Sequence, residues 1–246
     1  MRLTRVHVEQ ALAVGDSVAL PEDAATHLVR VMRMQPGDPC ILFNGDGNDY
    51  QARLLAVGKR GAEVEVVAAT PVDNESPLRI VLLQGIARGE KMDWILQKAT
   101  ELGVAGFLPV ESERSEVRLD AARAGKRLAH WRNVVASACG QSGRARVPAV
   151  EPPQPLQSAL DALPPGTARF LLDPGAGASI ATVVADGGDA CILAVGPEGG
   201  WSPRDRGQLQ AAGFTGLRLG PRILRTETAG IAAIAALQSR FGDLSA

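Results

Sequence analysis

The spacing of apolar and polar residues predicts β-strands in the first part of the chain. Residues 40–58 (CILFNGDGNDYQARLLAVG) hold two apolar runs around an Asn-Gly-Asp-Gly cluster, a pattern typical of a β-hairpin. Residues 62–70 (AEVEVVAAT) alternate apolar and charged positions, as a half-buried strand does. Residues 22–34 predict a short helix with Leu28, Val31 and Met32 on one side. We therefore expect a small β-barrel with one helix.

From residue 79 onward the apolar residues follow a different pattern. Residues 79–86 (RIVLLQGI) form a continuous apolar run, which is typical of a strand covered on both faces. Such runs alternate with amphipathic segments, and the segment at 202–213 begins with an N-cap serine and ends on glycine. This alternation predicts an α/β domain with a mostly parallel sheet. Further strands are expected at 106–110, 169–173, 191–196 and 216–220, and further helices at 89–104, at 120–139 and after Thr226.

The segment between the two patterns predicts a linker. Residues 70–79 (TPVDNESPLR) carry two prolines among polar residues. A chain of 246 residues has room for a large domain and a small one. We place the small domain at residues 1–72 and the large α/β domain at residues 73–246.

Composition and charge narrow the possible functions. The formal net charge is −1, so contact with nucleic acid needs a local basic patch. Residues 114–146 supply one, with eight Lys or Arg residues against two acidic ones. The three cysteines lie far apart and outside any CxxC spacing, which indicates reduced thiols in a cytoplasmic protein and no metal site. No apolar run reaches the ~18 residues of a membrane span, and the N-terminus lacks a signal-peptide core.

Three predicted strands end in glycine-containing loops. These loops are Pro-Gly-Ala-Gly at 174–177, Gly-Pro-Glu-Gly-Gly at 196–200 and Gly-Pro-Arg at 220–222. Ligands of parallel sheets bind at the carboxyl ends of the strands, and glycine lets the backbone approach them. The phosphate-binding patterns GxxxxGK[ST] and GxGxxG are absent. We expect one pocket lined by backbone groups and by an apolar wall of Leu171, Leu172, Leu219, Ile223 and Leu224.

The order of several motifs resembles one family of enzymes. Residues 194–202 (AVGPEGGWS) and 219–229 (LGPRILRTETA) resemble the C-terminal motifs of the SPOUT methyltransferases. More narrowly, they resemble the family that methylates N3 of a uridine in 16S ribosomal RNA. Segments 27–34, 88–104, 112–114 and 141–144 (HLVRVMRM, RGEKMDWILQKATELGV, SER and QSGR) match that family's pattern in the same order.

This resemblance implies properties that the pattern alone does not predict. It implies a PUA-like RNA-binding barrel in residues 1–72 and a SPOUT domain with a deep trefoil knot in residues 73–246. It also implies S-adenosylmethionine (AdoMet) as methyl donor, 16S rRNA of the small ribosomal subunit as partner, and a homodimer. One position departs from the family, because Gly140 stands where an acidic residue usually precedes the QSGR segment.

The resemblance also suggests roles for site residues. Arg225 is placed to hold a phosphate or a uracil oxygen. Glu198 and Glu227 are candidate bases, although Glu198 could instead cap its own turn and Glu227 could serve the helix dipole. Thr226 is favoured as an N-cap over a ligand contact, and Thr228 fits either role. The cofactor-binding residues expected in full are Leu171, Leu172, Gly196, Pro197, Gly199, Gly200, Leu219, Gly220, Ile223, Leu224, Thr226 and Thr228.

RNA contact is expected from basic residues of both domains. Residues 1–72 contain seven Lys or Arg and nine acidic residues, so any RNA-binding face there is local. The clearer patch is the basic stretch 114–146, where phosphate contacts predict salt-sensitive binding. The contacts expected are Arg2, Arg5, Arg30, Arg33, Arg88, Lys91, Arg114 and Arg144.

Three alternatives remain open from the sequence. A SPOUT ribose 2′-O-methyltransferase of RNA would have a similar pocket. A non-catalytic RNA-binding factor of ribosome assembly would have a pocket that does not bind AdoMet. An enzyme of small nucleotides is disfavoured by the missing phosphate-binding motifs.

Overall fold

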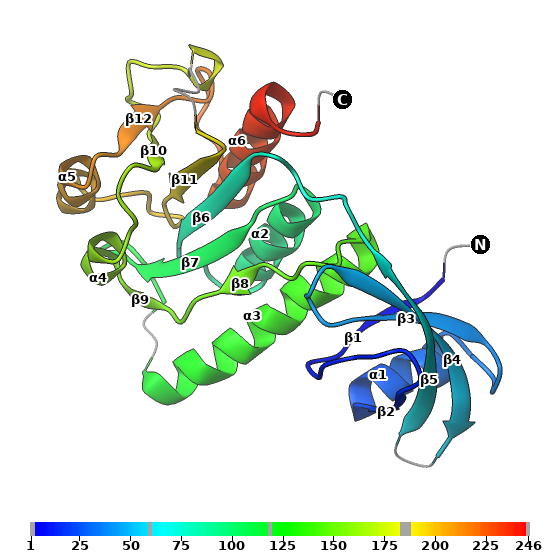
Figure 1. Cartoon of the computed structure of the whole chain (residues 1–246). Coiled ribbons are helices and arrows are strands. Elements are labelled where there is room, and N and C mark those ends of the chain that lie inside the picture. Colours follow the sequence, from blue (N-terminus) through cyan, green and yellow to red (C-terminus); the bar gives the residue numbers. More distant parts are fainter. Residues whose placement is uncertain (1–2, 59–60, 118–119, 183–187, 245–246) are drawn as a thin grey trace. The chain divides into compact units, whose positions relative to one another are not determined.

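The chain forms two compact units in a computed structural model that describes residues 3–58, 61–117, 120–182 and 188–244. One unit contains Met1–Glu75 and Ala136–Val147, and the other contains Ser76–Val135 and Pro148–Ala246. Figure 1 shows both, with residues 1–75 of the first unit in blue and cyan and its residues 136–147 in green.

The first unit is built around a five-stranded sheet. Its strands are β1 (Arg5–His7), β2 (Ser17–Leu20), β3 (Pro39–Phe43), β4 (Asn48–Val57) and β5 (Ala62–Pro71), in the order β1-β3-β4-β5-β2. The predicted hairpin is confirmed, because β3 and β4 pair antiparallel across a turn in which Gly45 and Gly47 have positive φ. Alternate residues of β4 and β5 are buried, as their alternation predicted.

The predicted helix at 22–34 is shorter and differently wound. It consists of α1 (Glu22–Thr26) and a π-helical turn, η1 (His27–Val31). Leu28 is buried as expected, but the exposed fractions of Val31 and Met32 are 65% and 47%. The prediction of one apolar face is therefore wrong for Val31 and Met32, because a π-turn fits more residues into each turn than the period of 3.6 assumes.

The second unit contains the predicted parallel sheet. Its strands lie in the order β12-β10-β11-β6-β7-β8, with β9 also paired to β7, and all these pairs are parallel within the described residues. The strands are β6 (Arg79–Gly85), β7 (Gly106–Glu111), β8 (Ala149–Val150), β9 (Gln154–Pro155), β10 (Ala168–Leu172), β11 (Ala190–Val195) and β12 (Thr215–Leu217). The strand expected at 216–220 is shorter and ends at Leu217, and Gly220 beyond it has a φ of +72°.

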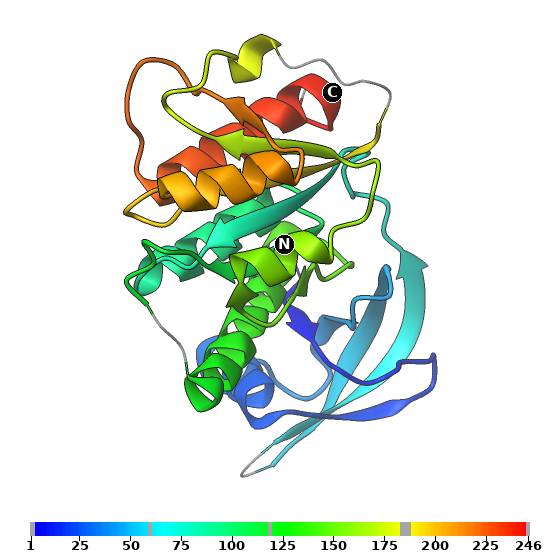
Figure 2. The same ribbon diagram turned by 90° about the vertical axis from the view of Figure 1, so that its left-hand side faces the viewer.

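Helices cover both faces of this sheet, which explains why its strands are continuously apolar. Helices α2 (Glu90–Glu101) and α6 (Thr226–Phe241) pack together, whereas α4 (Leu156–Asp161) and α5 (Pro203–Ala211) lie on the opposite face (Figure 2). A short 3₁₀ turn, η2 (Ile180–Thr182), contacts α6. The longest helix, α3 (Ala121–Ser142), contributes its last residues to the first unit.

The start of α5 shows how local sequence fixes one element beside the pocket described below. Ser202 is the N-cap, and its hydroxyl accepts a hydrogen bond of 3.0 Å from the Asp205 backbone N–H. The Asp205 carboxylate accepts the Ser202 N–H in return, at 3.0 Å. This reciprocal capping box confirms the predicted helix start and holds the chain just after the glycine loop at 196–200.

No described helix combines the length and the apolar character needed to cross a bilayer.

Candidate functional site

One cavity of about 450 Å³ opens at the carboxyl ends of the central strands of the second unit. The segments that follow β10, β11 and β12 line it, together with the first turn of α6. This is the edge of the sheet where the three glycine-containing loops were expected to meet. Its size falls within the range of pockets that bind small molecules.

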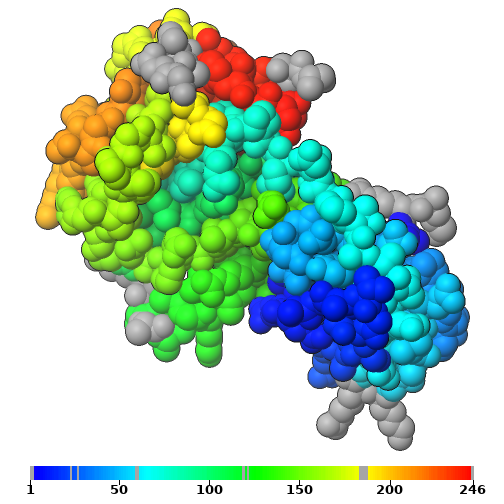
Figure 3. Space-filling view, viewed as in Figure 1, coloured from blue at the N-terminus to red at the C-terminus, as the bar shows by residue number. Residues whose placement is uncertain are grey.

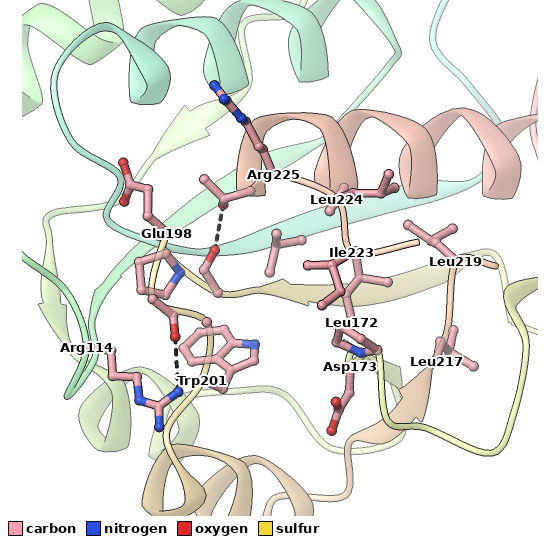
Figure 4. A pocket seen from close by; sticks show the side chains of 18 of the residues that line it. Arg114, Leu172, Asp173, Glu198, Trp201, Leu217, Leu219, Ile223, Leu224 and Arg225 are labelled. Atoms are coloured by element: carbon pink, nitrogen blue, oxygen red, sulfur yellow. Dashed lines mark hydrogen bonds between the residues drawn. The ribbon is translucent and has the colours of Figure 1, made fainter. Parts of the chain in front are cut away.

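One end of the cavity is apolar. Figure 4 shows the side chains of Leu172, Leu217, Leu219, Ile223 and Leu224 grouped on one side. Ile223 is 84% exposed, so its side chain stands at the surface of this wall. An apolar wall of this kind suits a flat, weakly polar ring such as adenine.

Leu171 does not line the cavity. It is 1% exposed and packs in the core between the sheet and helices α4 and α5. Successive residues of a strand point to opposite faces, so Leu172 faces the cavity and Leu171 faces away from it. The expectation of both residues in the wall therefore holds for Leu172 alone.

The loop at 196–200 is packed as closely as glycine allows. A Cβ atom on Gly196 would lie 3.1 Å from the Gly200 backbone, and a Cβ atom on Gly85 would lie 2.5 Å from Pro197 Cδ. The last residue of β6 thus touches the loop directly. The backbone groups of Gly196, Gly199 and Gly200 are held at the cavity by this packing.

Thr226 connects this loop to helix α6. The N-cap of α6 is Arg225, and Thr226 is the first helical residue, so the expected capping role of Thr226 is wrong. Its buried hydroxyl donates to the Gly196 carbonyl at 2.5 Å and accepts from Gln84 Nε2 at 3.1 Å. Gln84 also donates to the Gly85 carbonyl at 2.9 Å. Sequence analysis missed Gln84, although it is the one uncharged polar residue in the apolar run 79–86.

The other end of the cavity is charged, with Glu198 as its first element. The Glu198 carboxylate accepts hydrogen bonds from the Arg88 backbone N–H at 3.0 Å and from Lys91 Nζ at 3.1 Å. Partial burial raises the pKa of Glu198, but hydrogen bonds from its own backbone N–H, Arg88 and Lys91 outweigh burial and lower this pKa below its ordinary value. Glu198 therefore ties the glycine loop to the beginning of α2 and is held as a carboxylate.

Asp173 is a second carboxylate of the lining and lies beside Leu172 (Figure 4), and several cations also line the cavity. Asp173 pairs with Arg206 at 3.1 Å, and Arg114 donates to the Gly199 carbonyl at 3.1 Å. Arg222 and Arg225 are exposed, and their side chains make no hydrogen bond or ion pair with any described residue. Figure 4 shows the Arg225 side chain extending outward from the start of α6, with Glu198 to one side of it and Leu224 to the other. Asp173, Arg206 and Arg222 line the cavity although none of them is among the site residues predicted from the sequence.

Trp201 contributes an unusual polar atom to the lining. The residue is 3% exposed, yet its indole Nε1 is buried without a hydrogen-bond partner in the described part of the chain. Figure 4 shows the ring at the cavity, between Arg114 and Leu172. A buried donor without an acceptor is unfavourable, so this N–H suits a ligand that accepts a hydrogen bond.

Two expected site residues lie outside the lining of the cavity. Glu227 is half-buried in the first turn of α6, and one of its carboxylate oxygens is buried without a partner among the described residues. Thr228 is exposed. The cavity therefore gathers Glu198, Arg225 and Thr226, but not Glu227 or Thr228.

The basic residues expected to contact RNA fall into distinct groups. Arg30 and Arg33 are exposed, and Arg88 is exposed while paired with Glu116 at 2.9 Å. Lys91 and Arg114 line the cavity. Arg2 lies outside the described residues.

Arg5 and Arg144 instead stabilise the interior of the first unit. The guanidinium of Arg5 pairs with Asp49 and donates to the Arg144 carbonyl, and its carbon lies 4.9 Å from the centre of the Phe43 ring. Arg144 forms a double hydrogen bond with Glu75. Both side chains are 5% exposed. We therefore assign Arg5 and Arg144 to the stability of this unit rather than to phosphate binding.

Gly140 lies beside the same ion pairs. A Cβ atom at this position would lie 3.4 Å from the Arg5 carbonyl and 3.8 Å from the Phe43 ring. A longer acidic side chain would need space that Arg5 and Phe43 now border. The carboxylate that neutralises Arg5 comes instead from Asp49.

The cavity fits AdoMet in size and chemistry. Its apolar wall suits an adenine ring, its glycine backbone suits polar groups of the ligand, and the free indole N–H of Trp201 offers a donor. No cluster of three or more His, Cys, Asp or Glu residues suited to a metal ion occurs among the described residues.

Comparison with known proteins identifies the family. The family model of RNA methyltransferase domains matches residues 74–238, and that of RNA methyltransferase PUA domains matches residues 20–67. A similar solved structure is the ribosomal RNA small subunit methyltransferase E from Neisseria gonorrhoeae bound to S-adenosyl methionine. It is 42% identical, with a TM-score of 0.90, over 99% of this chain and 100% of that one.

Curated relatives carry the same name. The ribosomal RNA small subunit methyltransferase E of Buchnera aphidicola (subspecies Schizaphis graminum) is 32% identical over 99% of each chain. That of Bacillus subtilis is 30% identical over 96% of this chain and 94% of its own. With this identity over almost its whole length, the chain belongs to the ribosomal RNA small subunit methyltransferase E family.

Proposed function

We propose that this protein transfers the methyl group of AdoMet to N3 of a specific uridine in the 16S rRNA of the small ribosomal subunit. The names of its relatives and the bound cofactor of a solved neighbour support this activity. The observation that carries the proposal is the two-ended cavity. An apolar, glycine-lined end suits the cofactor, and a cationic end suits a base of an anionic polymer.

AdoMet would lie along the glycine loops. The backbone groups of Gly196, Gly199, Gly200 and Gly220 would hold its polar parts, and the leucine wall would hold its adenine. When bound, AdoMet supplies a methyl group on a sulfonium, so the reaction requires no metal. Thr226 and Gln84 would act indirectly, since their hydrogen bonds fix the loop at Gly196.

Arg225 would face the uridine. Its guanidinium extends from the start of α6 (Figure 4) and has no partner among the described residues, so it is available to a uracil oxygen or a phosphate. A planar guanidinium forms two parallel hydrogen bonds with a phosphate, and its N–H groups can also donate to a uracil oxygen. Glu198, which is held by Lys91 and Arg88, would position the loop instead of removing a proton.

The two parts of the chain would have different roles, one in RNA binding and the other in methyl transfer. Residues 1–72 would form a PUA-like RNA-binding barrel, and residues 73–246 would form the methyl-transfer domain, with the AdoMet loops in a trefoil knot. The protein would act as a homodimer in the cytoplasm, where ribosomal subunits are assembled. Arg30, Arg33 and Arg88 remain the RNA contacts proposed outside the cavity, because their side chains are exposed.

The basic residues of α3 extend the proposed RNA-binding surface. Arg123, Lys126 and Arg127 are exposed in the first turns of α3, whose surface is visible in green in Figure 3. Trp131 and Val135 of the same helix are buried, so the helix is anchored by one side while its basic residues remain accessible. Arg118, which belongs to the same stretch of sequence, lies outside the described residues.

The direct test uses purified protein, labelled AdoMet and either 16S rRNA or small subunits. Mass spectrometry of the nucleosides should show 3-methyluridine. Arg225→Ala should lose activity while its calorimetric affinity for AdoMet stays unchanged, and Arg204→Ala, an exposed arginine of α5 outside the cavity, is the matched control. Ribose methylation would contradict the assigned reaction, and absence of AdoMet binding would contradict catalysis altogether.

A further inference from the structure

The state of the uracil at the moment of transfer is the chemical problem that this cavity has to solve. Uracil N3 is an imide nitrogen that bears a proton and is a poor nucleophile while it keeps that proton. An enzyme can remove it with a side-chain base, or it can favour the imide anion that forms by exchange with water. The two routes need different residues around the base.

The carboxylates of the cavity are not suited to act as a base. Two carboxylates occur in its described lining, Asp173 and Glu198, and this lining contains no His, Cys or Tyr. Asp173 pairs with Arg206 at 3.1 Å and accepts the Gly175 backbone N–H at 3.0 Å. Glu198 accepts hydrogen bonds from Lys91 and from the Arg88 backbone, and its pKa is lowered. A carboxylate stabilised in its ionised form has a reduced affinity for protons.

The cations of the cavity outnumber these carboxylates. Five cationic side chains line it, and Arg222 and Arg225 among them make no ion pair within the part of the chain that the structure describes. Nearby positive charge favours the anionic form of an acid. The charged groups that border the cavity are Lys91 from α2, Arg114 after β7, Asp173 after β10, Glu198 after β11, Arg206 from α5, and Arg222 and Arg225 before α6.

We propose that this cavity methylates the imide anion of the uridine, and that Arg225, together with the other cations of the lining, stabilises this anion in place of a carboxylate base. The inference rests on the proposed function and adds the ionisation state of its substrate. Arg225 is the catalytic residue in this scheme, because its guanidinium would contact the uracil oxygen that carries the negative charge.

The reaction then has two steps, loss of the N3 proton and transfer of the methyl group. The N3 proton leaves to solvent water and the negative charge spreads over N3 and the two carbonyl oxygens. The N3 electron pair then forms the new N–CH₃ bond while the S–CH₃ bond breaks, and the pair of the broken bond stays on sulfur as a neutral thioether. The uracil anion loses its negative charge and the sulfonium loses its positive charge, so both products are neutral. No further reactant is needed.

The first test changes the acidity of the substrate and leaves the enzyme unchanged. Single-turnover rates are measured against pH with 16S rRNA transcripts containing either uridine or 5-fluorouridine, whose N3 is more acidic. We expect the rate to rise tenfold per pH unit up to a midpoint, and this midpoint to fall with 5-fluorouridine by the difference between the N3 pKa values of the two nucleosides. A midpoint that is the same for both transcripts would overturn the proposal, because it would belong to a group of the enzyme.

The second test reads the ionisation without turnover. Once mass spectrometry has located the methylated nucleotide, 5-fluorouridine is placed there in a short 16S rRNA fragment and bound with S-adenosylhomocysteine. The ¹⁹F chemical shift against pH then gives the N3 pKa in the complex. We expect this pKa to lie below that of the free fragment, whereas a bound pKa equal to or above the free value would overturn the inference.

Variants separate the cationic route from a carboxylate base. Arg225→Ala should lower kcat/KM by about 10²- to 10³-fold and move the ¹⁹F midpoint upward, because a stabilising charge is lost. Arg225→Lys should restore part of the shift, and Arg204→Ala should change neither value. Glu198→Gln should keep the midpoint of the pH–rate profile, because in this proposal the midpoint reports the ionisation of uracil N3. Glutamine can still accept the Arg88 N–H but cannot titrate. Loss of the midpoint in this variant would identify Glu198 as the base.

Failure of this inference is distinguishable from failure of the proposed function. If 3-methyluridine forms and the midpoint of the pH–rate profile is the same for uridine and 5-fluorouridine, the proposed reaction is supported and the anion route is wrong. If no 3-methyluridine forms although AdoMet and RNA both bind, the proposed reaction is wrong and the anion route falls with it.

Discussion

Trp201 is the residue whose chemistry is least satisfied by the protein alone. Its buried Nε1–H has no acceptor in the described chain, although the ring lines the cavity. Trp201→Phe removes this donor and keeps an aromatic ring. We expect about 3- to 10-fold weaker AdoMet binding, which corresponds to one hydrogen bond of ordinary strength, as measured by calorimetry.

Fluorescence provides the control for that substitution. The chain contains three tryptophans, of which Trp131 is buried in the second unit away from the lining and Trp94 is exposed on α2. The change in tryptophan emission on AdoMet binding should therefore be lost in Trp201→Phe and kept in Trp94→Phe. Equal affinity of Trp201→Phe and the unmodified protein would show that the indole N–H makes no bond to the cofactor.

Thr226 shows how a residue can serve a site without contacting the reaction. Its hydroxyl bridges the Gly196 carbonyl and the Gln84 amide, both from strands or loops far away in sequence. Thr226→Val keeps the shape but removes both hydrogen bonds of the hydroxyl, while Gln84 Nε2 keeps its bonds to the Gly85 and Gly196 carbonyls. We expect a loss of about 1–3 kcal/mol in the free energy of unfolding, together with weaker AdoMet binding.

Thr228→Val is the matched control for Thr226. Thr228 lies one half-turn further along α6, is exposed and stands outside the cavity. Urea unfolding of both variants, each with and without AdoMet, compares the two positions directly. If Thr226→Val is as stable as Thr228→Val, the hydroxyl bridge has no structural value.

At the level of elements, the glycine loop and α2 are joined by Glu198. Its carboxylate accepts the Arg88 N–H just ahead of α2, where the helix has no side-chain cap of its own. A helix N-terminus favours a negative charge there. This tether explains how a loop after β11 holds its position relative to α2, a helix that begins at Glu90, far earlier in the chain.

The lowered pKa of Glu198 gives this tether a pH dependence. Since the folded pKa is below the ordinary value of 4.5, the stabilisation is complete above pH 4.5 and is lost as pH falls through the folded pKa. Glu198→Gln should therefore be less stable than the unmodified protein at pH 7, by about 1 kcal/mol, and the difference should shrink at pH 3. Thermal unfolding at both pH values measures it, and a difference that grows in acid would contradict this account.

Strands and helices were largely predictable because their signals are local. The continuous apolar run at 79–86 became β6, and Ser202 with Pro203 began α5 as expected. The wrong predictions arise where the local backbone departs from the regular helix that the residue spacing assumes. The period of 3.6 does not hold in the π-turn at 27–31, which exposes Val31 and Met32.

The site was predictable in its loops and less so in its side chains. The Gly-Pro-Glu-Gly-Gly and Gly-Pro-Arg motifs located the cavity, but sequence does not show which neighbours a charged group will meet. The sequence makes Glu198 a candidate base, but Lys91 of α2 pairs with it. The sequence likewise makes Arg144 a candidate phosphate contact, but Glu75 pairs with it.

For the whole molecule, the net charge of −1 requires that RNA binding depend on local basic surfaces. Replacing Arg123, Lys126 and Arg127 of α3 by glutamine should make the slope of log Kobs against log salt less steep by about 2–3, since each lost phosphate contact removes one counterion. Filter binding with 16S rRNA at several salt concentrations gives the slope. Affinity for AdoMet should stay unchanged.

An exposed arginine of another helix controls for general charge effects. Arg204 of α5 lies outside the cavity and outside the basic stretch 114–146. Arg204→Gln should leave the slope as it is in the unmodified protein. A triple variant that keeps the original slope would show that the exposed face of α3 does not contact RNA.

The contact between Gly85 and Pro197 also constrains how the protein folds. The cavity draws on residues from Lys91 to Ala229, and β11 must enter the sheet between β6 and β10 before the loop can rest on Gly85. Pairing strands so distant in sequence is slow, because a long loop has to close first. The binding site is thus completed only when the sheet is complete, so we expect AdoMet to slow unfolding while leaving the rate of folding unchanged.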